Sequence, residues 1–371
     1  MKTLFLVGGS RAGIDLFQSL LDGHPQILQF PGIIHTTNKL ITILSHDDSR
    51  HVAKNFINDY QHFFDSRVNR VERHYMLGKK LNQFYLVNKN KFVENFVKIF
   101  KQKKNLTLKN EFFEKLLALH RAYALTSGQN IKSKKIMVIN CHRISYMKFV
   151  SKRLGNIDYE IIHTIRNPIS SISSATRNWL KYDKGKYFFA KDIFYELDLV
   201  TNGIKNLKKI SKKIFLVQLE QLHQNHQKVF DNFCTNYKLK FNKCMRESSY
   251  FNLKWWGDKV SGKNLDGINK KFKISFNKEI FYKRDIKFLE SILHNLIIFY
   301  NYDFKEKKKK YFFNFLPMKC EILTWQNTIR HKKFKHILSI PFFYIKRLIF
   351  INRLSQKNVK LPYSFGRFNR V

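Results

Sequence analysis

Short apolar runs alternate with helix-patterned segments at the start of the chain. The run Thr3–Val7 leads directly into a glycine-rich stretch, Gly8–Gly13, and apolar residues then recur at helical spacing from Gly13 to Asp22. A second apolar run, HPQILQF, follows at residues 24–30. A strand, a turn, a helix and another strand in this order predict a parallel sheet, because parallel neighbours need a crossover connection.

The same alternation returns further along the chain. Strands are predicted at the apolar runs KIMVIN (135–140), YEIIHTI (159–165) and KIFLVQLE (213–220). Helices are predicted between and after these runs, at 145–154, from Asn167 onward and from 221 to about Tyr237. Asn167 suits the N-cap of its helix and Pro168 suits the first turn. We therefore predict an α/β protein with a central parallel sheet of about five strands and helices on both faces.

Three other segments differ from this pattern. Residues 46–130 are polar and lysine-rich, with helical periodicity and no strand signal. After a loop at 254–269 and a helix predicted at 284–300, the chain from 304 onward is strongly basic. We predict an α/β domain over 1–303, with 46–130 as a helical insertion that forms a lid or acceptor region, and a basic helical appendage over 304–371.

The net charge limits the classes of partner. Among 371 residues, 69 are Lys or Arg and 27 are Asp or Glu, which gives a net charge of +42. Such a charge favours phosphate esters, anionic membranes or nucleic acid. Lys, Asn, Phe and Ile are raised throughout, as an AT-rich genome would also produce, so charge alone selects no partner. Nucleic-acid binding is the weaker alternative, because the sequence shows no known binding module and no interleaving of aromatic and basic residues on one sheet face.

The cysteines and apolar runs bear on location. The four cysteines have no CxxC spacing, which indicates a reduced protein. The first apolar run is shorter than a signal-peptide core, and no run approaches the roughly 18 apolar residues of a spanning helix. We expect a cytoplasmic protein. The segment 336–354, where Lys346, Arg347 and Arg353 alternate with aromatic residues, would either lie against the inner face of an anionic membrane or pack on the domain with solvated lysines.

The glycine-rich turn predicts an anion site. Backbone amides of residues 9–13 would point at a phosphate at the start of the following helix. Gly8 and Gly13 have the spacing of half a Walker A loop, but Ile14 and Asp15 stand where that loop has Lys-Ser/Thr. An ATPase or GTPase of the usual kind is therefore not expected.

Two motifs together resemble the sulfotransferases that use 3′-phosphoadenylyl sulfate (PAPS). The first is GSRAGIDLFQSLLDGHP at 9–25, and the second is IIHTIRNPISSISSATR at 161–177, in which Ser174 follows Arg166 by eight positions. The resemblance covers residues 1–35 and 135–235, extends less specifically to the loop at 255–268, and is absent from the insertion and the tail. It implies a P-loop-like three-layer fold. It implies PAPS as donor, adenosine 3′,5′-bisphosphate as product and no metal. It also implies a set of donor-binding residues: Gly9, Ser10, Arg11, Ala12, Gly13, Ile14, Asp15, Arg166, Ser174, Gly262 and Lys263.

The chemistry of these residues agrees with the resemblance. Arg166 follows a strand at the sheet edge where ligands gather, and a guanidinium suits the 3′-phosphate dianion. Ser174 lies two helical turns further on. Arg11 would face the sulfuryl group as charge develops in the transition state. For Arg166 the alternative is an ordinary surface arginine, and for Ser174 it is a serine on a helix face. For Arg11 the alternative is a solvated residue of the turn.

The sequence departs from the family pattern at several positions. Ile14 and Asp15 replace paired hydroxyls, and we expect Asp15 to turn outward, away from the anion. Related enzymes of the tyrosylprotein branch carry an activating glutamate near the position of Gly32, where glycine cannot serve. His35 is then the candidate general base, since an unperturbed histidine has a pKa near 6.5. A surface or hydrogen-bonded histidine is the alternative.

Further candidates come from the loops. His142 or Arg143 could replace the charge of a Lys-x-Pro turn that many members carry, and Cys141 is not expected to act as a nucleophile. Trp255 or Trp256 would either stack on adenine or pack in the core. We predict sulfuryl transfer to a hydroxyl or amine of a carbohydrate or other cell-envelope acceptor. The alternative is a non-catalytic or altered-donor relative that binds the nucleotide without transferring sulfate.

Overall fold

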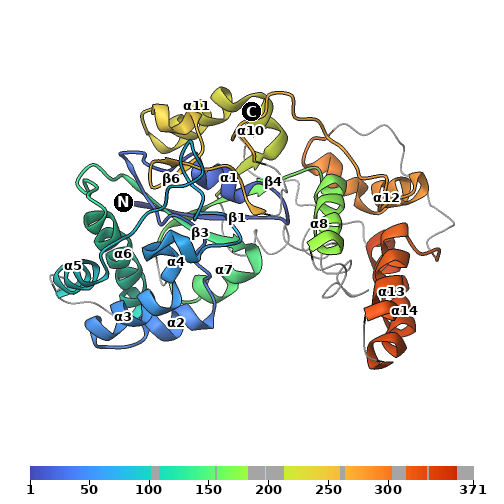
Figure 1. Cartoon of the computed structure of the whole chain (residues 1–371), viewed down its shortest axis with the longest axis horizontal. Helices are drawn as coiled ribbons and strands as arrows, with labels where there is room; N and C mark the ends of the chain where they lie inside the picture. Colours follow the sequence, from blue (N-terminus) through green and yellow to red (C-terminus); the bar gives the residue numbers. More distant parts are fainter. Residues whose placement is uncertain are drawn as a thin grey trace.

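A five-stranded parallel sheet forms the centre of the computed structural model (Figure 1). The structure describes residues 1–101, 108–154, 157–182, 197, 213–259, 264–302, 315–331 and 334–356. The strand order is β2-β3-β1-β4-β5, and every neighbouring pair is parallel. The strands are β1 (Lys2–Gly8), β2 (Ile27–Leu28), β3 (Ile136–Arg143), β4 (Tyr159–Ile165) and β5 (Ile214–Gln218). The predicted α/β class and five-stranded parallel sheet are confirmed.

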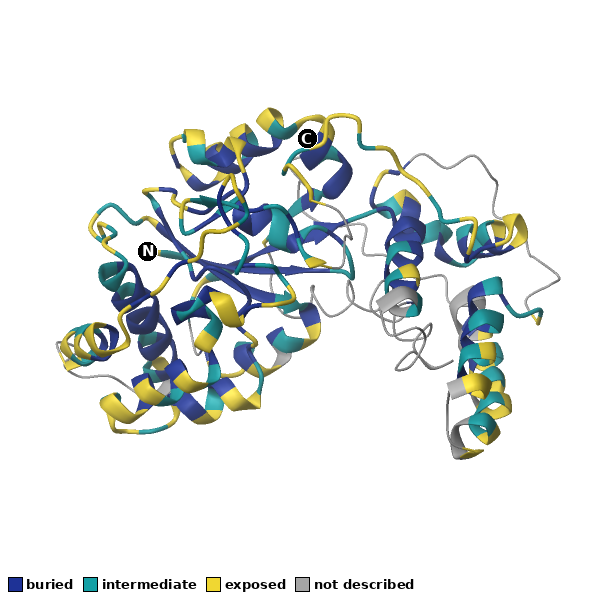
Figure 2. Ribbon diagram, in the orientation of Figure 1, coloured by how far each residue is buried: buried dark blue, intermediate teal, exposed yellow. Residues whose placement is uncertain are grey.

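Strand β1 lies in the middle of the sheet and separates two hydrophobic cores. Its side chains alternate between the faces, so that Leu4 and Leu6 belong to one core and Phe5 and Val7 to the other. All four are fully buried, as expected for a strand covered by helices on both faces (Figure 2). The predicted three-layer arrangement is therefore present.

Different helices cover the two faces of the sheet. One face packs against helices close to the sheet strands in sequence: α1 (Ile14–Ser19), α10 (Leu219–Gln224) and α11 (His226–Tyr237). The other face is covered mainly by the segment between β2 and β3, together with the helix that follows β3: α2 (Asn38–Leu44), α3 (Ser49–Asp59), α4 (Gln61–Phe64), α5 (Lys89–Lys101), α6 (Leu108–Thr126) and α7 (Ile144–Ser151). Residues 46–130 thus contribute helices to a core that they share with the sheet.

A third core joins the C-terminal helices to α8 (Pro168–Tyr182). Helix α12 (Lys283–Phe299) contacts α8, and α13 (Lys319–His331) and α14 (Phe334–Gln356) pack beside it (Figure 1). Met318, Cys320 and Ile351 are each about 1% exposed in this core. The part of the chain beyond 304 therefore buries apolar side chains of its own.

One residue of the basic C-terminal segment differs from its predicted role. Arg347 does not face solvent or a membrane, because its side chain is 1% exposed and its Nε donates to Glu321 of α13 at 2.8 Å and 3.0 Å. Its Nη2 also donates to the carbonyl of Leu316 at 2.8 Å. In the described part of the chain, no helix is both long enough and apolar enough to cross a membrane.

Candidate active site

A cavity of about 820 Å³ lies where β1, β3 and β4 end. Ligand sites of open parallel sheets form at this edge. All predicted site residues that belong to the described part of the chain line this single cavity: Gly9, Ser10, Arg11, Ala12, Gly13, Ile14, Asp15, His35, His142, Arg166 and Ser174. Gly262 and Lys263 lie outside the described residues. Residues separated by more than 150 positions in sequence therefore share one space.

The glycine-rich turn has backbone conformations that explain its composition. Gly13 has a φ of 80° and precedes the first residue of α1, and a Cβ at this position would clash with the side chain of Leu219. Arg11 also has a positive φ, 56°. The hydroxyl of Ser171 in α8 donates to the carbonyl of Ser10, which ties the turn to the helix that carries Ser174.

Arg166 occupies the position directly after β4. The next residue caps α8 as predicted, because Asn167 Oδ1 accepts from the amides of Ile169 and Ser170 at 3.1 Å. Burial lowers the pKa of the Arg166 guanidinium, and Glu220 opposes that shift. Its Nε is buried without a hydrogen-bond partner among the described residues. A buried cationic N–H group that lacks a hydrogen-bond partner is suited to binding an anionic ligand.

Glu220 supports this end of the cavity. It accepts from the amide of Asn167 at 2.9 Å and from the hydroxyl of Tyr302 at 2.7 Å. The guanidinium of Arg166 lies 5.6 Å from the ring centroid of Phe272, which also lines the cavity. Arg166 thus lies beside an aromatic ring and within the electrostatic influence of a carboxylate, and the two come from separate segments.

Arg11 lies in the glycine-rich turn and Asp15 in the first turn of the helix that follows it. Both residues line the cavity. Arg11 Nη1 forms an ion pair with Asp258 at 2.8 Å. The expectation that Asp15 turns outward is wrong, because Asp15 lines the cavity and its Oδ1 is buried without a hydrogen-bond partner among the described residues. Burial raises the pKa of Asp15 well above its ordinary value, and the carboxylates of Glu72 and Asp258 raise it further. Arg11 and Asn140 oppose this shift, and the net effect is that the carboxyl keeps its proton to higher pH than an ordinary aspartate.

The histidine candidates lie in the cavity but are weaker bases than the sequence suggests. Burial and the charge of Arg143 lower the pKa of His35. Burial, with Arg143, His35 and Arg11, lowers the pKa of His142 to about 4. His62, which the sequence reading did not select, lines the same cavity, and burial lowers its pKa to about 4. The expected histidine pKa near 6.5 therefore does not apply to His35.

The strand and loop candidates have mainly structural contacts. Cys141 is fully buried, and burial raises its pKa to about 12. Trp255 packs in the core, and its indole N–H donates to the carbonyl of Glu72 at 2.6 Å, although it also borders the cavity. Trp256 donates to the carbonyl of Gly78 at 2.7 Å. Core packing, rather than a freely exposed stacking face, describes Trp255 in this structure.

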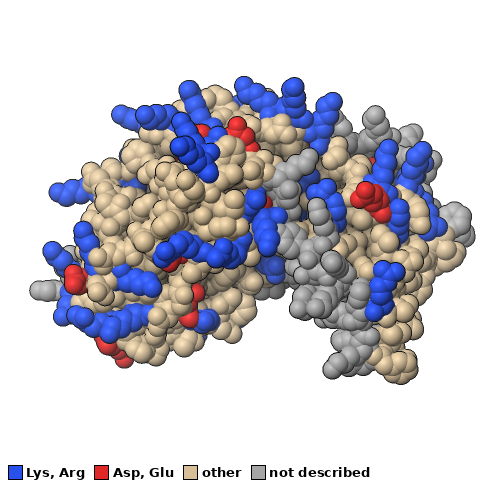
Figure 3. Space-filling view, viewed as in Figure 1, with Lys and Arg blue, Asp and Glu red and all other residues tan. Residues whose placement is uncertain are grey.

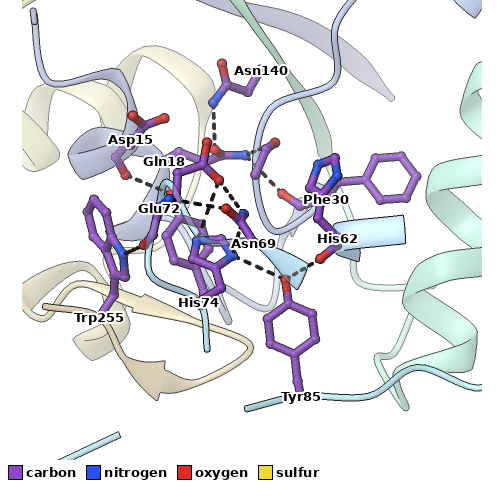
Figure 4. A network of polar contacts seen from close by, with 12 residues as sticks. Asp15, Gln18, Phe30, His62, Asn69, Glu72, His74, Tyr85, Asn140 and Trp255 are labelled. Atoms are coloured by element: carbon purple, nitrogen blue, oxygen red, sulfur yellow. Dashed lines mark hydrogen bonds and ion pairs between the residues drawn. The ribbon is translucent and has the colours of Figure 1, made fainter. Parts of the chain in front are cut away.

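Two carboxylates at the site were missed at the sequence level. Asp258 belongs to the loop after β7 (Leu253–Lys254), and Glu72 belongs to the segment between β2 and β3. A Cβ on Gly32 would stand 3.7 Å from Oε2 of Glu72 (Figure 4 shows Glu72 and its neighbours). A carboxylate is thus present beside Gly32, but it comes from a residue 40 positions further along the chain. No local motif around Glu72 marks it.

Comparisons with known proteins give similarities at low sequence identity. No protein-family model matches the chain, and no curated protein matches it. Similar solved structures include the sulfotransferase domain of the Synechococcus PCC 7002 olefin synthase, with 14% identity, a TM-score of 0.37 and coverage of 66% of this chain and 76% of that one. The sulfotransferase domain of the curacin biosynthetic pathway has 12% identity, a TM-score of 0.36 and coverage of 89% and 97%. Sulfotransferase STF9 from Mycobacterium avium has 11% identity, a TM-score of 0.43 and coverage of 82% and 78%.

Proposed function

We propose that the protein is a PAPS-dependent sulfotransferase that acts on a hydroxyl or amine of a carbohydrate or other cell-envelope acceptor. The observation that carries the proposal is that the glycine-rich turn, Arg166 and Ser174 line one cavity of about 820 Å³. Cavities of roughly 300–1,000 Å³ are typical of small-molecule sites. The two halves of the sequence resemblance thus meet in a space of suitable size for a nucleotide.

The donor would lie along this cavity with its two phosphate groups at different residues. Arg166 and Ser174 would bind the 3′-phosphate, and the buried, unpartnered Nε of Arg166 supports that role. The amides of the turn would hold the 5′-phosphosulfate. Because its pKa is raised, Asp15 keeps its proton to higher pH than an ordinary aspartate, and in its protonated form it would donate a hydrogen bond to an oxygen of the donor.

In the chemical step the acceptor would attack sulfur in line with the departing bisphosphate. Arg11 and the turn amides would stabilise the negative charge that develops on the bridging oxygen. Asp258, which pairs with Arg11 at 2.8 Å, would fix the direction of the guanidinium before the donor binds. No metal is required in this scheme.

The same proposal includes contact with an anionic membrane from the cytoplasmic side. Lys and Arg side chains are spread over the face in Figure 3, whereas Asp and Glu are few. Helix α14 presents an exposed apolar stripe to solvent, formed by Phe334, Leu338, Phe342, Ile345 and Ile349. Positive charge together with an apolar helix face is typical of proteins that bind membrane surfaces.

Nucleotide binding tests the proposal most directly. We expect calorimetry to give a much higher affinity for adenosine 3′,5′-bisphosphate than for AMP, because AMP lacks the group that Arg166 and Ser174 would bind. Replacing Arg166 with Ala should cost roughly 2–4 kcal/mol of bisphosphate binding, and Arg153→Ala, outside the cavity, should cost nothing measurable. Equal affinities for the two nucleotides would overturn the proposal.

A transfer assay distinguishes an active sulfotransferase from a non-catalytic relative that only binds the nucleotide. We expect ³⁵S from labelled PAPS to appear on members of a panel of glycans, alcohols and amines. Tight bisphosphate binding without label on any acceptor or in released sulfate would favour the non-catalytic alternative instead.

A further inference from the structure

Among the residues that the structure describes, three carboxyl groups face the cavity, and their surroundings differ. Asp15 stands in the first turn of α1, directly after the glycine-rich turn, where burial raises its pKa well above the ordinary value. Asp258 is paired with Arg11 at 2.8 Å. Glu72 comes from a different part of the fold, between the 3-10 helix Ser66–Val68 and α5. The three groups can therefore serve three separate purposes at one site.

The backbone of Glu72 is held at both of its polar groups. Its amide donates to Asn69 Oδ1 at 3.2 Å, and its carbonyl accepts from the indole of Trp255 at 2.6 Å (Figure 4). Its side chain is 14% exposed, and it lines the cavity beside Gly32. A carboxylate with a fixed backbone and a small exposed fraction is oriented toward the cavity rather than toward bulk solvent.

The side-chain amide of Asn69 holds the carboxylate itself, and a buried histidine contacts that amide in turn. Asn69 Nδ2 donates to Oε2 of Glu72 at 2.5 Å and also contacts Nδ1 of His74 at 3.2 Å. If the amide donates both bonds, the proton of His74 is on Nε2, which is 3.9 Å from Glu72 Oε2. Burial lowers the pKa of His74 to about 3, so the ring that contacts Asn69 stays neutral and adds no positive charge beside Glu72. Among the described residues the hydrogen bond to the carboxylate goes to Oε2, so Oε1 is the oxygen available to a proton-transfer partner.

We propose that Glu72 is the general base that removes the proton from the acceptor group during transfer. This inference rests on the proposed sulfotransferase function. The acceptor oxygen forms a bond to sulfur while the bond from sulfur to the bridging phosphate oxygen breaks, and that oxygen leaves with the electron pair. The proton of the acceptor hydroxyl moves to the Glu72 carboxylate and is later released to solvent.

The other groups of the cavity are less suited to this step. His35, His62 and His142 all have lowered pKa values, so they hold a proton weakly. Burial raises the pKa of Glu72, and Asp258 raises it further while Asn69 opposes the shift. A carboxylate with a raised pKa is a stronger base than an ordinary one. The titratable groups that surround it from the neighbouring segments are Asp15, His62, His74, Tyr85, Tyr250 and Asp258.

The test compares two variants of Glu72 with a matched control. Glu72→Gln keeps the size and the acceptor oxygen for Asn69 but cannot accept a proton. Glu72→Asp keeps the carboxylate and moves it by one methylene. Glu94→Gln changes an exposed glutamate of α5 in the same segment between β2 and β3, and it serves as the control. The readouts are bisphosphate affinity by calorimetry and transfer of ³⁵S from labelled PAPS to the acceptor panel and to water.

We expect Glu72→Gln to lower turnover about a hundredfold or more, with unchanged bisphosphate affinity and with partial recovery in Glu72→Asp. The wild-type rate should fall as the pH decreases through the pKa of Glu72, and Glu72→Gln should lose this acidic limb. A Glu72→Gln rate equal to that of the control overturns the role of Glu72 and leaves the transferase proposal standing. A wild-type protein that does not bind the bisphosphate, or binds it and transfers no label, overturns the transferase proposal and with it the role of Glu72.

Discussion

Arg11 combines a strained backbone with a charged side chain at the site. Its positive φ of 56° is uncommon for a residue other than glycine, and such conformations occur preferentially at functional sites. Its ion pair with Asp258 holds the guanidinium in the cavity. In the proposed function this held guanidinium would act on the charge that develops during transfer.

We therefore expect Arg11→Ala to lower turnover far more than it weakens bisphosphate binding. The turn amides alone can position the phosphate, and loss of a donor aimed at transition-state charge typically reduces the rate about 10²–10³-fold. Steady-state kinetics with labelled PAPS, together with calorimetry, provide the measurement. A loss of binding as large as the loss of rate would assign Arg11 to ground-state binding.

The carboxyl of Asp15 predicts a pH dependence of stability. In the unfolded chain Asp15 ionises at its ordinary pKa, whereas burial and the nearby Glu72 and Asp258 raise its pKa in the folded protein. Between these two pKa values the folded state binds more protons than the unfolded state, so the free energy of unfolding falls as the pH rises. Asp15→Asn removes this loss, and the variant should be more stable than the wild type above that pH window.

Urea denaturation at a series of pH values measures the effect. Asp65→Asn is a control of opposite sign, because bonds from Arg67 lower the pKa of Asp65. The stability that the ionised Asp65 adds is present above its ordinary pKa and is lost as the pH falls through the lowered pKa. If Asp15→Asn followed the wild type at every pH, the carboxyl would not be held in its neutral form.

At the level of elements, local patterns predicted the sheet better than they predicted strand lengths. Strand β1 appears as an apolar run, and β4 as a mainly apolar one, because both are buried on both faces. Asn167 marks the start of α8 through its side-chain bonds. The run at 24–30 is a strand only at Ile27 and Leu28, since only these two pair with β3. Apolar character alone does not specify how many residues find a partner.

The missed and misjudged residues depend on contacts between distant segments. Glu72 reaches the site because the segment between β2 and β3 folds over the carboxyl end of the sheet, and nothing in its immediate sequence indicates that path. Asp15 faces the cavity, where two other carboxylates favour its neutral form. His142 has a φ of 62° after an irregularity in the pairing of β1 and β3, which periodicity cannot predict.

The pairing of α13 and α14 predicts a large effect of one substitution. Arg347 and Glu321 form an ion pair in which each side chain is no more than 3% exposed. Removing one partner of a buried pair leaves an uncompensated charge and typically costs about 3–5 kcal/mol. We expect Arg347→Ala to destabilise the α13–α14 pair by this amount, measured by hydrogen exchange of its amides.

Two further variants test the cause of that effect. Lys346→Ala changes the exposed neighbour and should alter stability by less than about 0.5 kcal/mol. The double variant Glu321→Leu, Arg347→Met replaces both charges with apolar groups and should be more stable than either single change. A double variant as unstable as Arg347→Ala would mean that lost packing, rather than an orphaned charge, is responsible.

On the scale of the whole molecule, the net charge of +42 and the exposed face of α14 both bear on the proposed membrane contact. The five apolar residues of the stripe, Phe334, Leu338, Phe342, Ile345 and Ile349, are 72%, 62%, 54%, 56% and 47% exposed. They are spaced by three or four positions and therefore share one side of the helix. Arg347 and Ile351 are buried on the other side against the third core. Helix α14 can thus lie on a surface with its stripe while it stays attached to α12 and α13.

We expect the protein to co-sediment with vesicles in proportion to their phosphatidylglycerol content and to dissociate as salt is raised, because screening weakens the attraction between surface charges. A chain ending near Asp303 is a poor test, since it would remove Met318, Cys320 and Ile351 from the third core. Substituting Leu338 and Phe342 with Asn changes only exposed apolar groups and should weaken binding at every lipid composition. The control Leu86→Asn, at a residue that is 57% exposed far along the chain from α14, should bind like the wild type. Equal co-sedimentation of all three proteins would show that charge alone attracts the protein to the vesicles and that the α14 stripe makes no contact with lipid.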